Sequence, residues 1–85
     1  MADAGFDELE RHFEAASIAL GRGDRAAAAT ALRAVVCAAE VRDDAIEPLT
    51  IALARLGELE LEGGREAVAE GHFQRALALG EHRLG

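Results

Sequence analysis

Residues 64–78 read GREAVAEGHFQRALA, and this stretch is the strongest indicator of the fold. It opens on Gly64, and small or aromatic residues then recur three and four positions apart, at Ala69, Phe73 and Ala76. That spacing places the three side chains on one face of a helix, and polar residues occupy the other face. The stretch therefore predicts an amphipathic helix that begins directly after a glycine turn.

A similar pattern occurs earlier in the chain, 41 residues before. Gly23 and Gly64 are the equivalent turn residues. The aligned pairs in the two following helices are Ala28 with Ala69, Leu32 with Phe73, and Val35 with Ala76. A repeat with a period of about 20–50 residues is typical of stacked structural units.

Apolar spacing predicts four helices: one over 6–20, one over about 25–41, one that ends at Gly63-Gly64, and one over about 65–83. The expected buried faces of the last three are Ala28, Leu32, Val35, Val36 and Ala39; then Ile46, Leu49, Leu53 and Leu56; then Ala69, Phe73, Ala76, Leu77, Gly80 and Leu84. Loops this short make each helix antiparallel to the previous one. We therefore expect one all-α domain over 1–85, with two hairpins at about 6–41 and 45–84.

The ends of the predicted helices carry recognisable signals. Asp24 is a good N-cap for the second helix, and either Asp43 or Asp44 is available to cap the third, because a carboxylate accepts a hydrogen bond from an unpaired backbone N–H. Pro48 is expected in the first turn of the third helix, where its missing N–H costs nothing.

The second half of the chain resembles the tetratricopeptide repeat family. The resemblance rests on Leu56-Gly57 in the first helix of the unit, on Gly64 at the turn, and on Ala69, Phe73 and Ala76 in the second helix. The longer, kinesin-light-chain type of repeat fits the 41-residue offset better than the standard type. The resemblance implies a fragment of an α–α superhelix that binds other proteins.

Two features of this region bear on the resemblance. Glu60 stands where the family has an aromatic residue in the first helix. Small residues at Gly57, Ala69 and Ala76 would let the two helices of the hairpin approach closely, and Phe73 would fill the wedge between neighbouring hairpins.

Composition excludes several classes of function. The chain has 16 acidic and 9 basic residues, a net charge of −7, so it lacks the basic footprint that nucleic acids and anionic membranes require. No apolar run is long enough to span a membrane, and the first residues do not resemble a signal peptide. Cys37 is the single cysteine, which fits a reducing compartment. We therefore expect a cytoplasmic protein, and the excess of alanine and arginine is typical of a GC-rich bacterial genome.

No catalytic, cofactor or metal site is expected. The histidines His12, His72 and His82 have no second histidine three or four positions away, and Glu8 with His12 would provide only one corner of a metal site. Cys37 lies between Val36 and Ala38 in a helix, with no adjacent His or Arg that would activate the thiol, so we expect a mostly buried, unreactive thiol. An enzyme is therefore the least favoured class.

The favoured function is a non-catalytic protein-interaction module. The repeat alignment predicts a mixed apolar and acidic groove formed by the first and third helices. Its predicted binding residues are Phe13, Glu14, Ser17, Leu20, Ile51, Arg55, Glu58, Leu61 and Glu62. Such a surface would suit a protein partner that carries apolar anchors and basic residues.

Two other expectations concern partners. Leu77, Leu79 and Leu84 of the last helix could pack against a second copy, because stacked hairpins leave open ends. The alternative function is that of a small acidic inhibitor, of the immunity-protein or antitoxin type, that covers a basic site on its partner. The net charge of −7 is compatible with an interaction module and with an acidic inhibitor.

Overall fold

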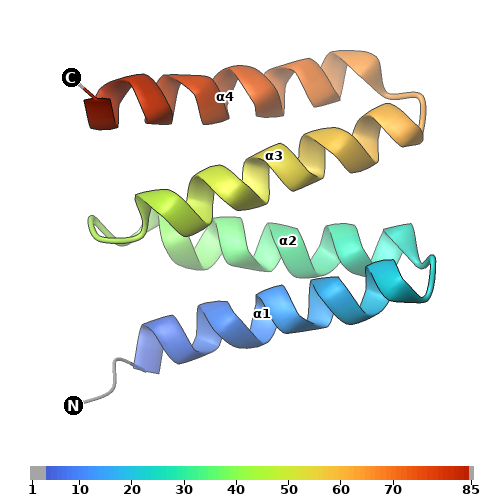
Figure 1. Ribbon diagram of the computed structural model, residues 1–85, viewed down its shortest axis with the longest axis horizontal. Helices are drawn as coiled ribbons and strands as arrows, with labels where there is room; N and C mark the ends of the chain where they lie inside the picture. The colour runs from blue at the N-terminus through green and yellow to red at the C-terminus, as the bar shows by residue number, and fades with distance from the viewer. Residues whose placement is uncertain (1–3, 85) are drawn as a thin grey trace.

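The computed structural model describes residues 4–84, and their side chains from Phe6 to Glu81. Over that range it contains four helices and no strand. They are α1 (Ala4–Gly21), α2 (Arg25–Glu40), α3 (Ile46–Glu62) and α4 (Glu66–Leu84). Successive helices run antiparallel, so α1–α2 and α3–α4 form two hairpins (Figure 1). The all-α fold predicted from the sequence is confirmed.

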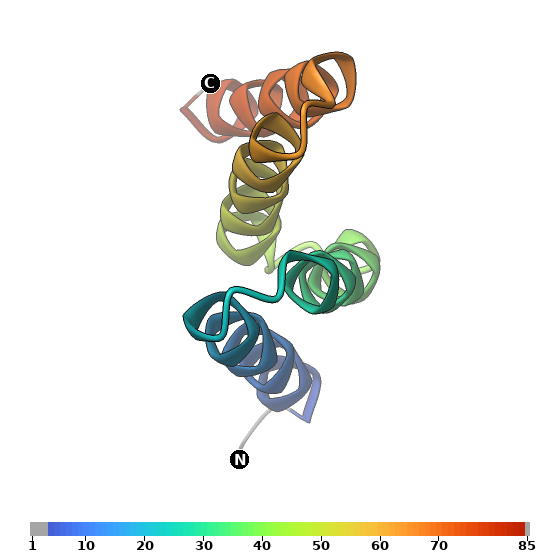
Figure 2. The same cartoon turned by 90° about the vertical axis from the view of Figure 1, so that its right-hand side faces the viewer.

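The helices pack chiefly on their neighbours along the chain. α1 lies against α2, α2 against α3, and α3 against α4. Seen nearly along the helices, α3 lies between α4 and the first hairpin (Figure 2). The molecule measures 40 × 31 × 16 Å, and α2 is displaced to one side of α1 and α3 across its shortest dimension (Figure 2). Much of each helix therefore remains at the surface.

One apolar core joins the two hairpins. Its largest fully buried side chains are Leu9, Leu32, Val35, Leu53 and Leu56. The whole predicted face of α2 is buried, and so are the three leucines of the predicted α3 face, while Ile46 is partly buried. The spacing of apolar residues by three and four therefore identified the core of these two helices correctly.

The two hairpin turns have the same hydrogen-bonding pattern. Gly23 and Gly64 adopt positive φ angles of 74° and 81°, which glycine tolerates because it has no β-carbon. The N–H of the next residue then donates to a carbonyl five positions back: Asp24 to Ala19 at 2.9 Å, and Arg65 to Glu60 at 2.8 Å. This is the Schellman arrangement, and it ends both α1 and α3. The 41-residue repeat predicted from the sequence is thus present in both turns.

One predicted cap is confirmed and one is wrong. The Asp24 carboxylate accepts a hydrogen bond from Ala27 N at 3.0 Å and caps α2. At α3 the N-cap is Ala45, which makes no side-chain cap and is fully buried. The Asp44 carboxylate instead accepts two hydrogen bonds from Arg42, at 2.9 and 3.0 Å. The N-cap residue Ala45 faces the core, so neither aspartate of the turn occupies the cap position.

The predicted face of α4 needs correction. Ala69 and Ala76 are buried and Phe73 and Gly80 partly so, but the Leu77 side chain is 64% exposed. Successive residues of a helix are rotated by about 100°, so when Ala76 faces α3 its neighbour points away. Leu79 packs against the core instead. The side chain of Leu84 lies outside the described residues.

Two further expectations are wrong. The Cys37 side chain is exposed, because the adjacent Val36 faces the core and the cysteine is rotated away from it. Phe73 does not lie between the hairpins: its ring packs over Gly57 inside the second hairpin. The contacts between the two hairpins come chiefly from α2 and α3.

Candidate functional site

A largely apolar cavity lies between the end of α3 and α4. It has a volume of about 420 Å³. Leu61 of α3 and Phe73 and Leu77 of α4 supply its apolar lining. Glu66, Glu70 and Gln74 of α4 supply the polar lining. The Leu61 and Leu77 side chains are 49% and 64% exposed, so a large apolar surface faces the solvent here.

The sequence of α4 explains why these residues share one face. Glu66, Glu70, Phe73 and Leu77 follow one another at intervals of four, three and four residues, which is the spacing of a helical stripe. The stripe can approach α3 because Gly57 has no side chain under the Phe73 ring. The ring therefore lies low between the two helices, with Leu61 and Leu77 beside it in the same cavity.

A second, smaller cavity lies toward the other end of the same helix pair. It has a volume of about 240 Å³ and is lined by Glu47, Thr50, Ile51 and Gly80. Along α3, Ile51 and Leu61 are separated by ten residues, or about 15 Å of helix. We call the surface that holds both cavities the α3–α4 groove. It offers two apolar positions about three helical turns apart.

Acidic residues dominate the rim of the α3–α4 groove. Glu66 and Glu70 line its larger cavity, and Glu58 lies one turn before Leu61 on α3. Glu58 contacts Arg55 at 3.4 Å, and both side chains are more than half exposed. An exposed pair of this kind is weakly held and exchanges readily with other charged groups. The rim therefore presents negative charge to an approaching molecule.

The predicted binding residues fall into two sets. On α3, Ile51 and Leu61 lie in the α3–α4 groove. Glu62 is turned toward the first hairpin, where its carboxylate lies 3.9 Å from Arg25 Nε. On α1, Glu14, Ser17 and Leu20 are exposed and Phe13 is partly buried against the core. The two cavities of the groove contain no α1 residue, and α1 packs on α2.

Sequence reasoning missed the α4 side of this groove. Phe73 and Leu77 were expected in the core, and the sequence analysis assigned no binding role to Glu66 or Glu70. Glu60, which stands where the family has an aromatic residue, is buried. The regular spacing of Glu66, Glu70, Phe73 and Leu77 places these residues on one face of a helix. It predicts a groove only together with the close packing of α4 on α3, which Gly57 permits.

Over the described residues there is neither a metal-binding cluster nor a membrane-spanning helix. Between Phe6 and Glu81, no three His, Cys, Asp or Glu side chains are grouped as a metal ion would require. The His12 and Glu8 side chains contact each other at 3.6 Å. Within the described helices, none combines the length and the apolar character of a membrane-spanning segment.

No protein-family model, curated protein or solved structure matches the chain. The α3–α4 groove is therefore interpreted from its own shape and charge.

Proposed function

We propose that this protein is a non-catalytic interaction module that binds a segment of a partner protein in the α3–α4 groove. The observation that supports the proposal is the combination of exposed apolar side chains at Leu61 and Leu77 with an acidic rim at Glu66 and Glu70. Exposed apolar surface bordered by polar residues is typical of protein interaction sites. The resemblance of the second hairpin to a tetratricopeptide repeat supports the same class of function.

The geometry of the groove defines the partner segment. Two apolar positions about 15 Å apart suit an amphipathic helix of about three turns, with one apolar anchor at each end. The acidic rim favours arginine or lysine beside those anchors. The net charge of −7 would also speed the encounter with a basic segment, and salt would weaken that attraction.

A peptide library displayed on phage and selected on the immobilised protein tests the proposal. We expect the selected peptides to combine Leu, Ile or Phe with Arg or Lys. Leu61→Ser and Leu77→Ser should each weaken their binding about tenfold, because both side chains would contact the apolar anchors. Glu70→Arg should weaken it further at low salt, since it reverses a charge of the rim.

Matched controls separate the groove from the rest of the surface. Val68→Ser changes an exposed apolar residue of α4 that does not line the groove, and it should leave binding unchanged. Leu20→Ser tests the α1 part of the groove predicted from the sequence. If Leu20→Ser and Leu61→Ser weaken peptide binding equally, the binding site is instead formed by the faces of α1 and α3. Selected peptides without basic residues, or binding unaffected by the Leu61 and Leu77 variants, would contradict the proposal.

A further inference from the structure

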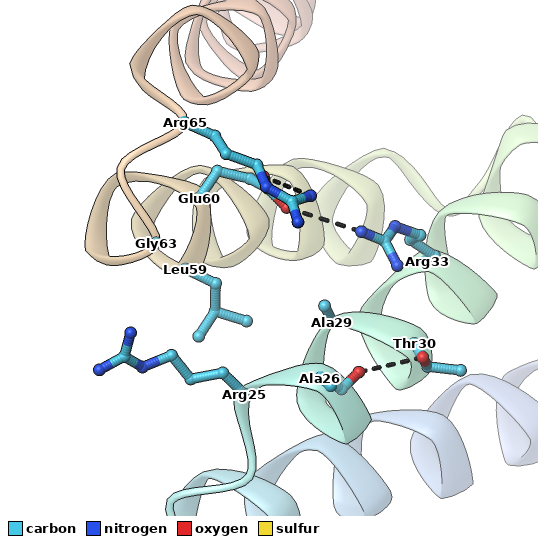
Figure 3. Close-up of a pocket in the computed structure, with 9 residues that line it drawn as sticks. All are labelled: Arg25, Ala26, Ala29, Thr30, Arg33, Leu59, Glu60, Gly63 and Arg65. Carbon is cyan, nitrogen blue, oxygen red and sulfur yellow. Dashed lines mark hydrogen bonds and ion pairs between the residues drawn. The ribbon is translucent and has the colours of Figure 1, made fainter.

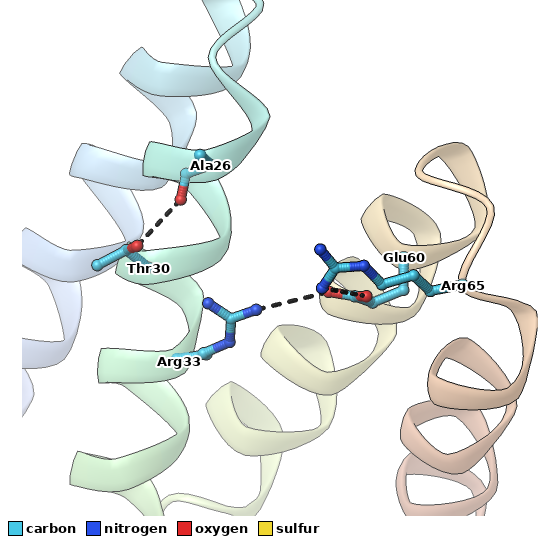
Figure 4. A network of polar contacts seen from close by, with 5 residues as sticks. All are labelled: Ala26, Thr30, Arg33, Glu60 and Arg65. Carbon is cyan, nitrogen blue, oxygen red and sulfur yellow. Dashed lines mark hydrogen bonds and ion pairs between the residues drawn. The ribbon is translucent and has the colours of Figure 1, made fainter.

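A buried carboxylate lies on the opposite side of the second hairpin. The Glu60 side chain is only 6% exposed, although it belongs to a chain whose other acidic residues over the described range lie at the surface. Arg33 of α2 and Arg65 of the α3–α4 turn reach it from two sides (Figure 4). Arg33 Nη2 lies 3.6 Å from Glu60 Oε1, and Arg65 Nη1 lies 3.5 Å from Glu60 Oε2.

The fold does not require a charged residue at this position. In the first hairpin the equivalent residue is Ala19, which is also buried and whose carbonyl accepts the same turn hydrogen bond. Alanine therefore satisfies the local geometry. A buried ion pair rarely stabilises a protein more than apolar residues of the same volume would. Stability of the turn is thus a weak explanation for Glu60.

The hydrogen-bonding capacity of the two arginines is largely unused. Their contacts with Glu60 are longer than the roughly 2.7–2.9 Å of a strong charge-assisted hydrogen bond. Arg75 of the same protein reaches Glu40 at 2.9 Å. The Glu60 Oε2 atom itself is buried and accepts no hydrogen bond. Both arginine side chains are more than half exposed, so their remaining N–H groups can donate to a molecule from the solvent.

These groups border a cavity of about 410 Å³ between α2 and the end of α3. Figure 3 shows Arg33 and Arg65 converging on Glu60 at one side, with Arg25 on the opposite side. The apolar part of the lining consists of Ala26, Ala29 and Leu59. A volume of this size lies within the range of about 300–1,000 Å³ that is usual for small-molecule sites. Three arginines and the Glu60 carboxylate line the cavity, and the Glu62 carboxylate lies 3.9 Å from Arg25. With Glu62 included, the group still has one positive charge in excess, on an acidic protein.

We propose that this arginine-lined cavity binds a phosphate group. The planar guanidinium group matches the oxygen spacing of a phosphate and can donate two hydrogen bonds to it. Arg33 and Arg65 would each donate from the edge that faces away from Glu60. Glu60 would hold the two guanidinium groups at one end of the cavity, and Arg25 would add positive charge at the other rim. The site lies on another side of α3 from the α3–α4 groove and does not depend on the function proposed for that groove.

Nuclear magnetic resonance titration with inorganic phosphate tests the site directly. In phosphate-free buffer at low salt, we expect saturable shifts of the Nε–H signals of Arg33 and Arg65 and of amide signals near Glu60. Arg33→Gln and Arg65→Gln should each weaken phosphate binding about tenfold, because each removes charge-assisted hydrogen bonds. Both side chains are exposed, so the variants should remain folded, as circular dichroism can verify.

Arg55→Gln is the matched control, because Arg55 is an equally exposed arginine of α3 that pairs with Glu58 and does not line the cavity. It should leave the phosphate shifts intact. Shifts that do not saturate at millimolar phosphate, or that survive the combined Arg33→Gln and Arg65→Gln substitutions, would overturn the proposal.

The source of the phosphate group is resolved by two further probes. One is O-phosphoserine within a short peptide, and the other is a sugar phosphate of similar charge. Tighter binding of the phosphopeptide than of inorganic phosphate would identify a phosphorylated partner protein. Tighter binding of the sugar phosphate would identify a small metabolite. In either case Arg33→Gln must abolish the gain in affinity over inorganic phosphate. A gain in affinity that persists in this variant would contradict the site.

Discussion

The Phe73 ring occupies the space into which a side chain at residue 57 would project, and Gly57 leaves that space open. A β-carbon built on Gly57 would lie 2.7 Å from two of the ring carbons, closer than non-bonded carbons approach one another in folded proteins. The glycine therefore determines how closely α4 approaches α3. Both the hairpin and the α3–α4 groove depend on this contact.

Gly57→Ala should destabilise the protein. Alanine is the better helix former, but its methyl group would push the Phe73 ring outward, and overpacking of this kind costs about 1–2 kcal/mol. Gly71→Ala is the control: Gly71 lies within α4 with no atom near its virtual β-carbon, so the substitution should stabilise by about 0.5–1 kcal/mol. Urea unfolding followed by circular dichroism measures both.

The same contact can be isolated with a second substitution. If the ring causes the loss, Gly57→Ala should become neutral or stabilising in a Phe73→Leu background, because leucine is smaller and can move aside. An equal loss in both backgrounds would show that another neighbour of Gly57 is responsible.

Asp24→Ala should destabilise the protein by about 1 kcal/mol, because it removes the side-chain hydrogen bond that caps α2. Asp24→Asn should retain most of the stability, since its amide oxygen can accept the same bond from Ala27 N. Thermal unfolding of the two variants gives the comparison. If alanine and asparagine behave alike, the cap does not contribute to stability.

The Glu60 site makes a prediction about stability that is separate from ligand binding. Glu60→Leu should leave stability unchanged or raise it, because it removes a buried charge and keeps the volume. Replacing both Arg33 and Arg65 by alanine should lower stability by about 1–2 kcal/mol, since Glu60 would lose both of its cationic contacts. Denaturant unfolding in phosphate-free buffer measures both. A large loss of stability in the Glu60→Leu variant would instead show that the carboxylate has a structural role.

Cys37 should react readily in the folded protein, because its side chain is exposed. With a thiol reagent such as dithionitrobenzoate, the rate should lie within about tenfold of the rate for the denatured chain. The absorbance of the released thiolate follows the reaction. A rate that is negligible until denaturant is added would contradict the exposure of this side chain.

The sequence predicted the helices well because their apolar faces are regular. The apolar face of α2 that includes Leu32 and the apolar face of α3 that includes Leu53 are both covered by neighbouring helices. The residues that the spacing places on these faces are therefore buried. The outer helix was harder. Periodicity shows that Ala76 and Leu77 lie near one apolar face, but which of them faces α3 depends on the rotation of α4, and Gly57 with Phe73 determines that rotation.

The candidate site was less predictable because it depends on how helices are placed. Ile51, Glu58 and Leu61 could be assigned to an exposed face of α3 from their spacing. The α4 residues of the groove could not be assigned in this way, because their place depends on how closely α4 approaches α3. The burial of Glu60 is also invisible in the sequence, because Arg33 is 27 positions away and its contact depends on how α2 packs on α3.

The stepwise packing of each helix on the next has a kinetic consequence. Chains whose contacts are mostly short-range in sequence lose little entropy when each contact closes, and they fold in microseconds to milliseconds. Because α1 packs on α2, α2 on α3, and α3 on α4, this protein belongs to that class. Folding can begin at either hairpin turn and continue to the other hairpin. The folding transition state should require few contacts between residues distant in the chain.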